Sequence, residues 1–426
     1  MAPHSHCKVS YVRWPNAGYS RRCCYVALLL IGAAATGVAS RRGGSGPLLP
    51  SHPHRSRRAL QESAPAAAAA AAPAPAAADT GQDGHQEVVL AVFGDSLSDT
   101  GNTFRAAGVP QADLYYQGRY SNGPIWVDYL AAEVANTTQL TVWNYAYGGA
   151  VACPDTTAGG GGGLSGRYPF IRDLPAQTEL FLNQTAAEQR RWQQGQQAEA
   201  GGGGGGGARR RLLVPINWIG NDDVRLFMRA AIIAGSPPDS RALTSLALAI
   251  TSCRLAWAQQ LLAAGEAVWG QQRGPQRVLV LLPLMQLDLL PETPEPLRLQ
   301  LRQIVAVLNA VLNGSVAALQ QDLDAAAGAG AGGGAGGGGG GGARLLVLPE
   351  EMESLIQSMR PPFNSSGPCF NHPLDGLQPV AVADVRPCAD PNNHAFYDQL
   401  HPSTRVHEAL ALRQVLPALR RAGLPL

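Results

Sequence analysis

Ser96 is the residue of this sequence best placed for chemistry. It stands in a Gly-Asp-Ser turn after the apolar run Val88 to Val92, which is typical of a buried strand. Such a turn can hold a serine hydroxyl clear of the sheet, and a helix that starts after it directs backbone N–H groups and its positive end at that site. A serine nucleophile needs both. By itself, however, Gly-Asp-Ser is also an ordinary turn or helix cap, so the rest of the chain must decide.

Asp398 and His401 are candidates for the other reactive groups. Acyl transfer by serine needs a base that takes the hydroxyl proton and a carboxylate that orients the base. Of the nine histidines, only His401 has an aspartate three positions before it. The alternatives are that Asp398 only caps a turn and that His401, before Pro402, is a surface residue. His407, in the expected last helix, is predicted to pack.

Gly149 and Asn221 are candidate donors to the oxyanion that a serine attack creates. The backbone N–H groups of Ser96 and Gly149 would supply two donors, and the side-chain amide of Asn221 a third. Glycine also lets the backbone approach the substrate closely. Taken alone, Gly148-Gly149 is better explained as a turn, and Gly220-Asn221-Asp222 is open to explanation as an αL turn with a helix N-cap. The four segments together, each at a strand end or before the last helix, argue for one site.

Short apolar runs alternate with helical patterns along the chain. This alternation favours a parallel sheet covered by helices on both faces. In such a sheet, active residues gather at the carboxyl ends of the strands. The expected strands are Val88 to Phe93, Leu140 to Tyr147, Leu212 to Ile219, Arg277 to Leu284 and Arg344 to Leu348, and the expected helices are Ile125 to Asn136, Asp223 to Ala234, Arg241 to Ala264, Pro296 to Leu323, Glu351 to Met359 and Thr404 to Ala422.

The order of these segments resembles the GDSL-type esterases and lipases of the SGNH hydrolase superfamily. That family is marked by a Gly-Asp-Ser block, a glycine block, a Gly-x-Asn-Asp-like block and an Asp-x-x-His block. One further segment resembles a stretch that follows the nucleophile block in the plant and fungal branch, and the match spans roughly residues 88 to 412. The matching segments are Gly94 to Asn102, Asn144 to Ala150, Ile219 to Asp222, Asp398 to His401 and, for the plant and fungal branch, Gly118 to Trp126.

The resemblance implies a flavodoxin-like three-layer α/β/α sandwich with a parallel central sheet. It implies Ser96 as the nucleophile, with Asp398 and His401 completing a catalytic triad. It also implies an oxyanion hole formed by Ser96, Gly149 and Asn221, with the adjacent Gly148 as the alternative to Gly149, and chemistry without a metal or cofactor. Because Asp398 already provides the carboxylate that orients the base, we expect Asp95, which precedes Ser96, to shape the Gly-Asp-Ser turn by hydrogen bonding.

Composition limits the partners and the size of the domain. The 426 residues carry a net charge of +2, which does not suggest a nucleic-acid partner. Residues 201–207 are glycine only and 325–342 are glycine and alanine only, so both are expected to be low-complexity loops. Without its first 85 residues, the chain is sized for a single hydrolase domain over 86–424.

The first 40 residues have the layout of a secretory signal. Basic residues precede an apolar stretch, residues 23–39, that ends in small side chains. This stretch is slightly short for a membrane span, which needs about 20 residues. Arg41 and Arg42 follow it directly, so an uncleaved anchor that tethers the protein to a membrane is the alternative. Residues 41–85 are expected to be a disordered Ala/Pro-rich linker, and the domain is expected to be secreted or, if anchored, to lie within the secretory pathway.

Four of the seven cysteines fall in the expected domain, which in a secreted chain permits disulfides. Cys369 with Cys388 is the preferred pair because both lie in one Pro-rich loop; four buried free thiols are the alternative. Glycosylation is permitted at four Asn-x-Ser/Thr sequons. The other two cysteines are Cys153 and Cys253, and the sequons begin at Asn136, Asn183, Asn313 and Asn364.

These features predict a secreted serine esterase or lipase that hydrolyses carboxylic esters through an acyl-enzyme. The substrate would be an ester of a small molecule, a polysaccharide or a lipid. The alternative is an acyltransferase that uses the same triad on a polysaccharide acceptor in the secretory pathway, which an uncleaved anchor would favour. A non-catalytic binding module on this fold is a third reading, against which the full set of reactive residues argues.

Overall fold

The central strand of the protein is β1 (Glu87–Gly94), in which every residue from Val88 to Phe93 is fully buried. Its apolar run is covered on both faces, as expected for a strand inside a parallel sheet. In the computed structural model, β1 pairs in parallel with β2 on one side and with β3 on the other. The whole sheet is parallel, in the order β2-β1-β3-β4-β5. The other strands are β2 (Leu140–Asn144), β3 (Arg211–Trp218), β4 (Val278–Leu281) and β5 (Arg344–Val347).

The structure describes residues 87–154, 163–200, 211–236, 238–270, 277–330, 342–349, 351–359, 363–370 and 386–426. The predicted targeting segment 1–40, the predicted linker 41–85 and the glycine tract 201–207 therefore lie outside the described residues.

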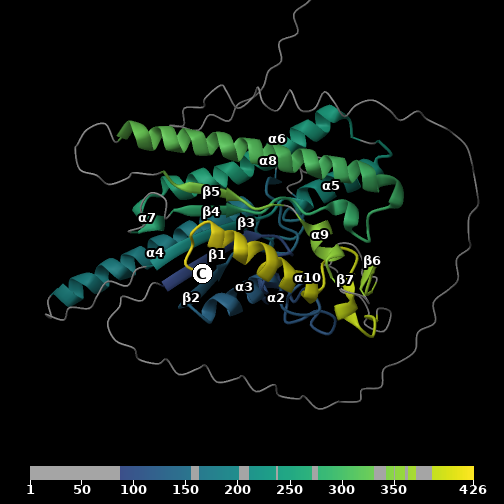
Figure 1. Cartoon of the computed structure of the whole chain (residues 1–426), viewed down its shortest axis with the longest axis horizontal. Helices are drawn as coiled ribbons and strands as arrows, with labels where there is room; N and C mark the ends of the chain where they lie inside the picture. Colours follow the sequence, from purple (N-terminus) through teal and green to yellow (C-terminus); the bar gives the residue numbers. More distant parts are fainter. Residues whose placement is uncertain are drawn as a thin grey trace, which may run out of the picture. The chain divides into compact units, whose positions relative to one another are not determined.

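Helices cover both faces of the sheet. On one face α3 packs against β2 and against the C-terminal helices, and on the other α4 contacts β1 while α8 contacts β5 and α6. Figure 1 shows α6 and α8 on one side of the strands and α3 on the other. The protein is thus a three-layer α/β/α sandwich with the flavodoxin-like strand order, which confirms the predicted fold class. The helices are α2 (Asn102–Ala107), α3 (Trp126–Ala135), α4 (Leu174–Ala200), α5 (Asn221–Ile233), α6 (Ser240–Ala263), α7 (Glu266–Trp269), α8 (Glu295–Gly330), α9 (Met352–Gln357), α10 (Thr404–Ala409) and α11 (Leu416–Arg421).

A π-helical stretch, two 3₁₀ turns and a small sheet complete the C-terminal part and the loop after β4. A π-helical stretch, Leu410–Val415, joins α10 to α11. Short 3₁₀ turns occur at Leu287–Leu289 and Pro391–Asn393. A second, two-stranded parallel sheet is formed by β6 (Asn364–Pro368) and β7 (His394–Phe396), and it lies close to the segment that carries Asp398 and His401.

Helix α4 and the end of α8 are the longest differences from the sequence-based expectation, and the short helix α7 and the β6–β7 sheet were not expected either. Helix α4 was not expected, because beyond Thr185 its side chains are mostly polar and carry no apolar stripe at helical spacing; its first turns bury Leu174 and Phe181 against the core. Helix α8 continues to Gly330, so the start of the predicted loop 325–342 is helical. The alanines at 325–327 favour this continuation, whereas glycine disfavours helix by about 1 kcal/mol per residue.

Among the described residues, α8 is the one helix long and apolar enough to cross a membrane. Length and composition alone are weak evidence for a membrane span. One face of α8 packs into the core of the domain through Ile304, Leu308 and Leu312. This stripe has the spacing of a helix that covers a sheet.

Candidate active site

The turn that carries Ser96 begins where β1 ends at Gly94. Gln177 of α4 holds both backbone groups of Gly94: its Oε1 accepts the Gly94 N–H at 3.0 Å and its Nε2 donates to the Gly94 carbonyl at 2.8 Å. Asp95 accepts a hydrogen bond from the Leu97 N–H at 3.0 Å, so its side chain shapes the turn. Ser96 is half-buried. Among the described residues, the backbone N–H of Ser96 has no hydrogen-bond acceptor.

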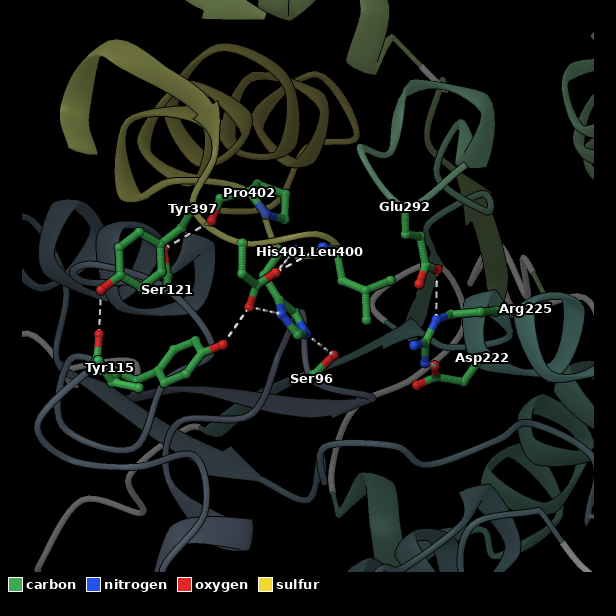
Figure 2. A network of polar contacts seen from close by, with 12 residues as sticks. Ser96, Tyr115, Ser121, Asp222, Arg225, Glu292, Tyr397, Leu400, His401 and Pro402 are labelled. Carbon is green, nitrogen blue, oxygen red and sulfur yellow. Dashed lines mark hydrogen bonds and ion pairs between the residues drawn. The ribbon is translucent and has the colours of Figure 1, made fainter. Parts of the chain in front are cut away.

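His401 joins Ser96 to Asp398. Its Nε2 lies 2.9 Å from Ser96 Oγ, and its Nδ1 lies 2.7 Å from Asp398 Oδ2. Figure 2 shows the imidazole of His401 directed at Ser96. An ionised carboxylate only accepts hydrogen bonds, so Nδ1 carries the proton and Nε2 is free to accept the one from Ser96 Oγ. The three side chains form one chain of hydrogen bonds between residues 305 positions apart.

Four donors hold the buried carboxylate of Asp398. Oδ1 accepts the backbone N–H groups of Leu400 and His401, each at 2.7 Å. Oδ2 accepts both His401 Nδ1 and the hydroxyl of Tyr115, the latter at 2.5 Å. Burial alone would raise the pKa of Asp398, but the charge of His401, its hydrogen bond and that of Tyr115 lower the pKa to about 2. Asp398 is therefore ionised at neutral pH.

Of the two adjacent glycines after β2, Gly149 has the available backbone donor. The N–H of Gly148 is already used: it donates to Asp99 Oδ2 at 3.0 Å and to Thr103 Oγ1 at 2.8 Å. The N–H of Gly149 has no acceptor among the described residues. Gly149 also has a φ of 80°, a left-handed conformation that glycine adopts without strain. The geometry thus favours Gly149 over Gly148 as an oxyanion donor.

Asn221 follows β3 and is the first residue of α5. Its Oδ1 accepts the backbone N–H of Met285 at 2.9 Å, which fixes the orientation of the amide. Its Nδ2 is buried and makes no hydrogen bond of ordinary geometry, although it lies near enough to the Asp95 carboxylate to lower the pKa of that group. A buried amide donor with no better partner is available to a ligand oxygen such as an oxyanion. Asn221, Ser96 and Gly149 thus follow the three neighbouring strands β3, β1 and β2.

A disulfide and a buried carboxylate hold the loop that follows Gly149. Asp223 of α5 accepts the backbone N–H groups of Ala152 at 2.7 Å and of Cys153 at 3.0 Å. Cys153 is bonded to Cys253 of α6, with 5.6 Å between their Cα atoms. The alternative of four free thiols is therefore wrong for the structure: Cys153 with Cys253, and Cys369 with Cys388, are disulfides.

Buried charges lie beneath the turn of Ser96. Burial and then the charge of Asp222 raise the pKa of Asp95 well above its ordinary value, and the hydrogen bonds from the Leu97 N–H and the Asn221 side chain lower it by less. Burial also lowers the pKa of Arg254 to about 10, against the opposing charges of Asp223 and Asp95. Arg254 thus stays charged at neutral pH. Its guanidinium donates to the Asn217 Oδ1 at 2.9 Å and to backbone carbonyls, which satisfies a charge that would otherwise be costly to bury.

The structure places every predicted site residue where the site can be assembled. Hydrogen bonds join Ser96, His401 and Asp398 directly, while Gly149 and Asn221 follow β2 and β3, the two strands that flank β1. His407 is fully buried in α10, in agreement with a packing role, and neither of its ring nitrogens has a hydrogen-bond partner.

Two supporting residues were missed by sequence reasoning. Gln177 holds Gly94, and Asp99 accepts from Gly101, Asn102 and Thr103 as well as Gly148. Asp99 lies within the conspicuous segment Gly94 to Asn102, so its position was a usable signal. Gln177 lies in the polar helix α4, where no pattern distinguishes it from its neighbours.

Comparison with known proteins gives a family and two partial relatives. A family model described as GDSL-like lipase/acylhydrolase matches residues 90–413. A phosphatidylcholine-sterol acyltransferase of Aeromonas hydrophila is 36% identical over 97 residues, 22% of this chain and 27% of that protein. A thermolabile hemolysin of Vibrio parahaemolyticus serotype O3:K6 (strain RIMD 2210633) is 40% identical over 63 residues, 14% of either chain. The matched segments thus span about a quarter or less of these two relatives.

Proposed function

Since the chain belongs to the family of GDSL-like lipases and acylhydrolases, enzymes that act on esters, we propose that it is a serine esterase with Ser96, His401 and Asp398 as its catalytic triad. The observation that carries the proposal is the chain of hydrogen bonds from the half-buried Ser96 Oγ through both nitrogens of His401 to the buried Asp398. This is the arrangement that a hydroxyl nucleophile requires for activation by a neighbouring base.

In the proposed reaction, His401 Nε2 takes the proton of Ser96 Oγ as that oxygen attacks the ester carbonyl. The carbonyl oxygen becomes negatively charged and accepts from the N–H groups of Ser96 and Gly149 and from the Asn221 amide. When the tetrahedral intermediate collapses, the carbon–oxygen bond to the alcohol breaks and His401 gives its proton to that alcohol. Water then repeats the sequence on the acyl-Ser96 ester and releases the acid. Asp398 stabilises the imidazolium in both halves without taking its proton.

Labelling by a fluorophosphonate, followed by hydrolysis of a panel of esters of increasing acyl length, tests this proposal. We expect covalent labelling that peptide mapping places on Ser96, and hydrolysis of at least one ester class. The Ser96→Ala variant should show neither. Unchanged hydrolysis of p-nitrophenyl acetate by Ser96→Ala would contradict the serine mechanism, and an intact protein that is neither labelled nor active would favour a binding role.

Acyl transfer is the second candidate function, and the relative named as a phosphatidylcholine-sterol acyltransferase favours it. Transfer and hydrolysis differ only in whether an acceptor hydroxyl or water attacks the acyl-Ser96 ester. Incubation with a phospholipid donor, with and without a sterol or a polysaccharide as acceptor, separates the two. Acylated acceptor in place of free acid would identify a transferase, whereas free acid alone in all mixtures would identify a hydrolase.

We further propose that the domain is secreted, as the layout of residues 1–40 suggests. The two disulfides support an oxidising compartment, because such bonds do not persist in the cytosol. The sequon residues Asn136, Asn183, Asn313 and Asn364 are all exposed, which is compatible with glycosylation. N-terminal sequencing of protein from the culture medium tests secretion and cleavage together. Protein retained in the membrane with residues 23–39 intact would support the anchor instead.

A further inference from the structure

The segment from Leu114 to Pro124 has no role in the mechanism proposed above, although part of it stands out in the sequence. In the structure it lies against the turn that carries Asp398 and His401, about 280 positions further along the chain. Ser121 Oγ donates to the Pro402 carbonyl at 2.9 Å, and the Thr404 N–H donates to Asn122 Oδ1 at 2.9 Å. Side-chain and backbone groups of the two segments are therefore joined directly after His401.

Tyr115 makes the one contact from this segment that reaches a reactive carboxylate. Its hydroxyl donates to Asp398 Oδ2, the same oxygen that accepts His401 Nδ1. Tyr115 and His401, both labelled in Figure 2, thus donate to one carboxylate oxygen. With two backbone donors on Oδ1, the tyrosine hydroxyl completes the set that fixes the carboxylate plane.

The protonation state of Tyr115 suits a permanent donor. Burial raises the pKa of its phenol well above the ordinary value, and the charge and hydrogen bond of Asp398 raise it further. The phenol therefore stays protonated over the whole working range of an esterase. A hydrogen bond from a neutral donor to a buried carboxylate is among the stronger ones in proteins.

Packing holds the Tyr115 ring in one position. Its ring meets those of Phe370 and Tyr397 edge-on, at centroid distances of 5.8 and 5.6 Å. The disulfide Cys369–Cys388 belongs to the same buried cluster. The Tyr397 hydroxyl donates to the backbone carbonyl of Leu114, which ties the residue before Tyr115 to the residue before Asp398. The cluster is thus a rigid support for a single hydroxyl.

A second tyrosine of the segment supports the base itself. The ring of Tyr120 lies 5.0 Å from that of His401, tilted by 36°. Its hydroxyl occupies the space where a Cβ on residue 148 would stand, so only glycine fits there. Tyr120 therefore packs between His401 and the backbone that precedes Gly149.

We propose that Tyr115 is a positioning residue of this active site, whose hydroxyl holds the Asp398 carboxylate in the orientation that His401 needs. The inference rests on the proposed function of Ser96, His401 and Asp398. On this proposal, the segment Leu114–Pro124 places the Tyr115 hydroxyl at the turn of Asp398 and His401, which does not follow a strand of the central sheet.

Removal of the hydroxyl has two consequences for catalysis. The carboxylate loses one of four donors and gains freedom to rotate away from His401. With one donor fewer, the Asp398 carboxylate also interacts more strongly with the imidazolium of His401, which favours the protonated form of the base. The first effect lowers kcat and the second moves the acidic limb of the pH–rate profile upward. KM should change little, because Tyr115 is buried and only 2% exposed.

The experiment compares Tyr115→Phe with Tyr116→Phe, its matched neighbour. Tyr116 is 37% exposed, and its hydroxyl makes no hydrogen bond to a described residue. For Tyr115→Phe we expect kcat to fall about 10- to 100-fold, KM to stay within about twofold and the acidic limb of kcat/KM to move to higher pH. Tyr116→Phe should match the unmodified protein. Site-specific 3-fluorotyrosine at position 115, a stronger donor of the same shape, should move the limb to lower pH and serves if Tyr115→Phe is unstable.

A readout independent of turnover separates this inference from the proposed function. The proton on His401 Nδ1 gives a far-downfield NMR signal when it is bonded to a carboxylate, which can be recorded in a Ser96→Ala background. A shift of that signal in Tyr115→Phe but not in Tyr116→Phe supports the positioning role even if no ester is hydrolysed. An unshifted signal together with an unchanged pH profile overturns the role of Tyr115, whereas an unlabelled Ser96 overturns the proposed function instead.

Discussion

The two halves of the candidate site are built in different ways. The half with Ser96 is held mostly by contacts within a few residues: Asp95 accepts from Leu97, and Asp99 accepts from Asn102 and Thr103. The half with Asp398 and His401 does not follow a strand of the central sheet. Segments far away in the sequence hold it, since Tyr115 is 283 positions from Asp398.

A second remote segment, at Glu292, supports the same acid–base turn. The N–H of Glu292 donates to the carbonyl of Gln399 at 3.1 Å, and the Glu292 carboxylate pairs with Arg225 at 2.7 Å. Figure 2 shows Arg225 and Glu292 beside the His401 turn. The turn of Ser96 is thus shaped largely by its own residues, with Gln177 of α4 as a remote support, whereas the acid–base half depends on the correct packing of several remote segments. Each half also has its own disulfide.

The largest expected effect is the loss of activity on removal of Ser96 or His401, and rescue by added imidazole distinguishes the two losses. Both Ser96→Ala and His401→Ala should lower kcat/KM by about 10⁴-fold or more, because each removes a group that takes part in the bond changes. Added imidazole should restore part of the activity of His401→Ala by entering the space of the lost ring, but should restore none to Ser96→Ala. Hydrolysis of p-nitrophenyl acetate, with the imidazole-catalysed background subtracted, measures this. Equal rescue of both variants would contradict the assigned roles.

The two disulfides should differ in what their loss affects. Replacing Cys153 and Cys253 by serine opens a separation of 100 residues and should destabilise the protein by about 4–5 kcal/mol on loop entropy; replacing Cys369 and Cys388, 19 residues apart, should cost about 3 kcal/mol. Activity should respond in the opposite order, because only the second pair packs against Tyr115. Urea unfolding and kcat, measured on both double variants, test this. A larger kcat loss from the first pair would reverse the comparison.

Asn221→Ala should lower kcat about 10²- to 10³-fold with little change in KM, because the amide acts only on the developing oxyanion. A matched control is Asn309→Ala. The Asn309 side chain also bonds a backbone N–H of the segment after β4, at Leu284, but lies outside the set of oxyanion donors. The control should lose stability and keep kcat. Steady-state kinetics of the two variants decide, and a similar kcat in both would remove Asn221 from the oxyanion hole.

The smallest expected effect concerns the pH dependence of stability through His407. Burial, and then the charge of His401, lower the pKa of His407 to about 3, whereas an unfolded histidine has a pKa of about 6.5. Between these values the unfolded state binds a proton that the folded state excludes. This contribution is thus absent above about pH 6.5 and destabilises the protein by about 1.4 kcal/mol per pH unit below it, down to about pH 3.

His407→Leu should therefore flatten the loss of stability below pH 6.5. Asp223, whose pKa burial raises to about 7, is present in both proteins, so its opposite slope cancels in the difference between them. The free energy of unfolding, measured at intervals from pH 7.5 to pH 5, checks the prediction. Parallel curves for the two proteins would show that His407 is not held neutral.

Much of the fold could be predicted because local sequence patterns indicate its strands and most of its helices. The buried strands appear as short apolar runs, and each of the five expected in the sequence overlaps a strand of the central sheet. Helix α4 was not predicted, since only its first turns carry apolar residues that reach the core. The extension of α8 to Gly330 was missed because a Gly/Ala composition does not show where a packed helix ends.

The sequence by itself identified the residues of the proposed site, namely Ser96, Asp398, His401, the glycine pair and Asn221, and the five strands of an α/β sandwich. Only the tertiary structure decided the rest. The N–H of Gly148 is bonded to Asp99, which leaves the N–H of Gly149 as the available donor. Cys153 is bonded to Cys253, and Tyr115 donates to Asp398. The physical reason is the range of the interactions. Turns, caps and apolar periods depend on neighbours within a few residues, whereas the donors to Asp398 meet it only after the layers have packed.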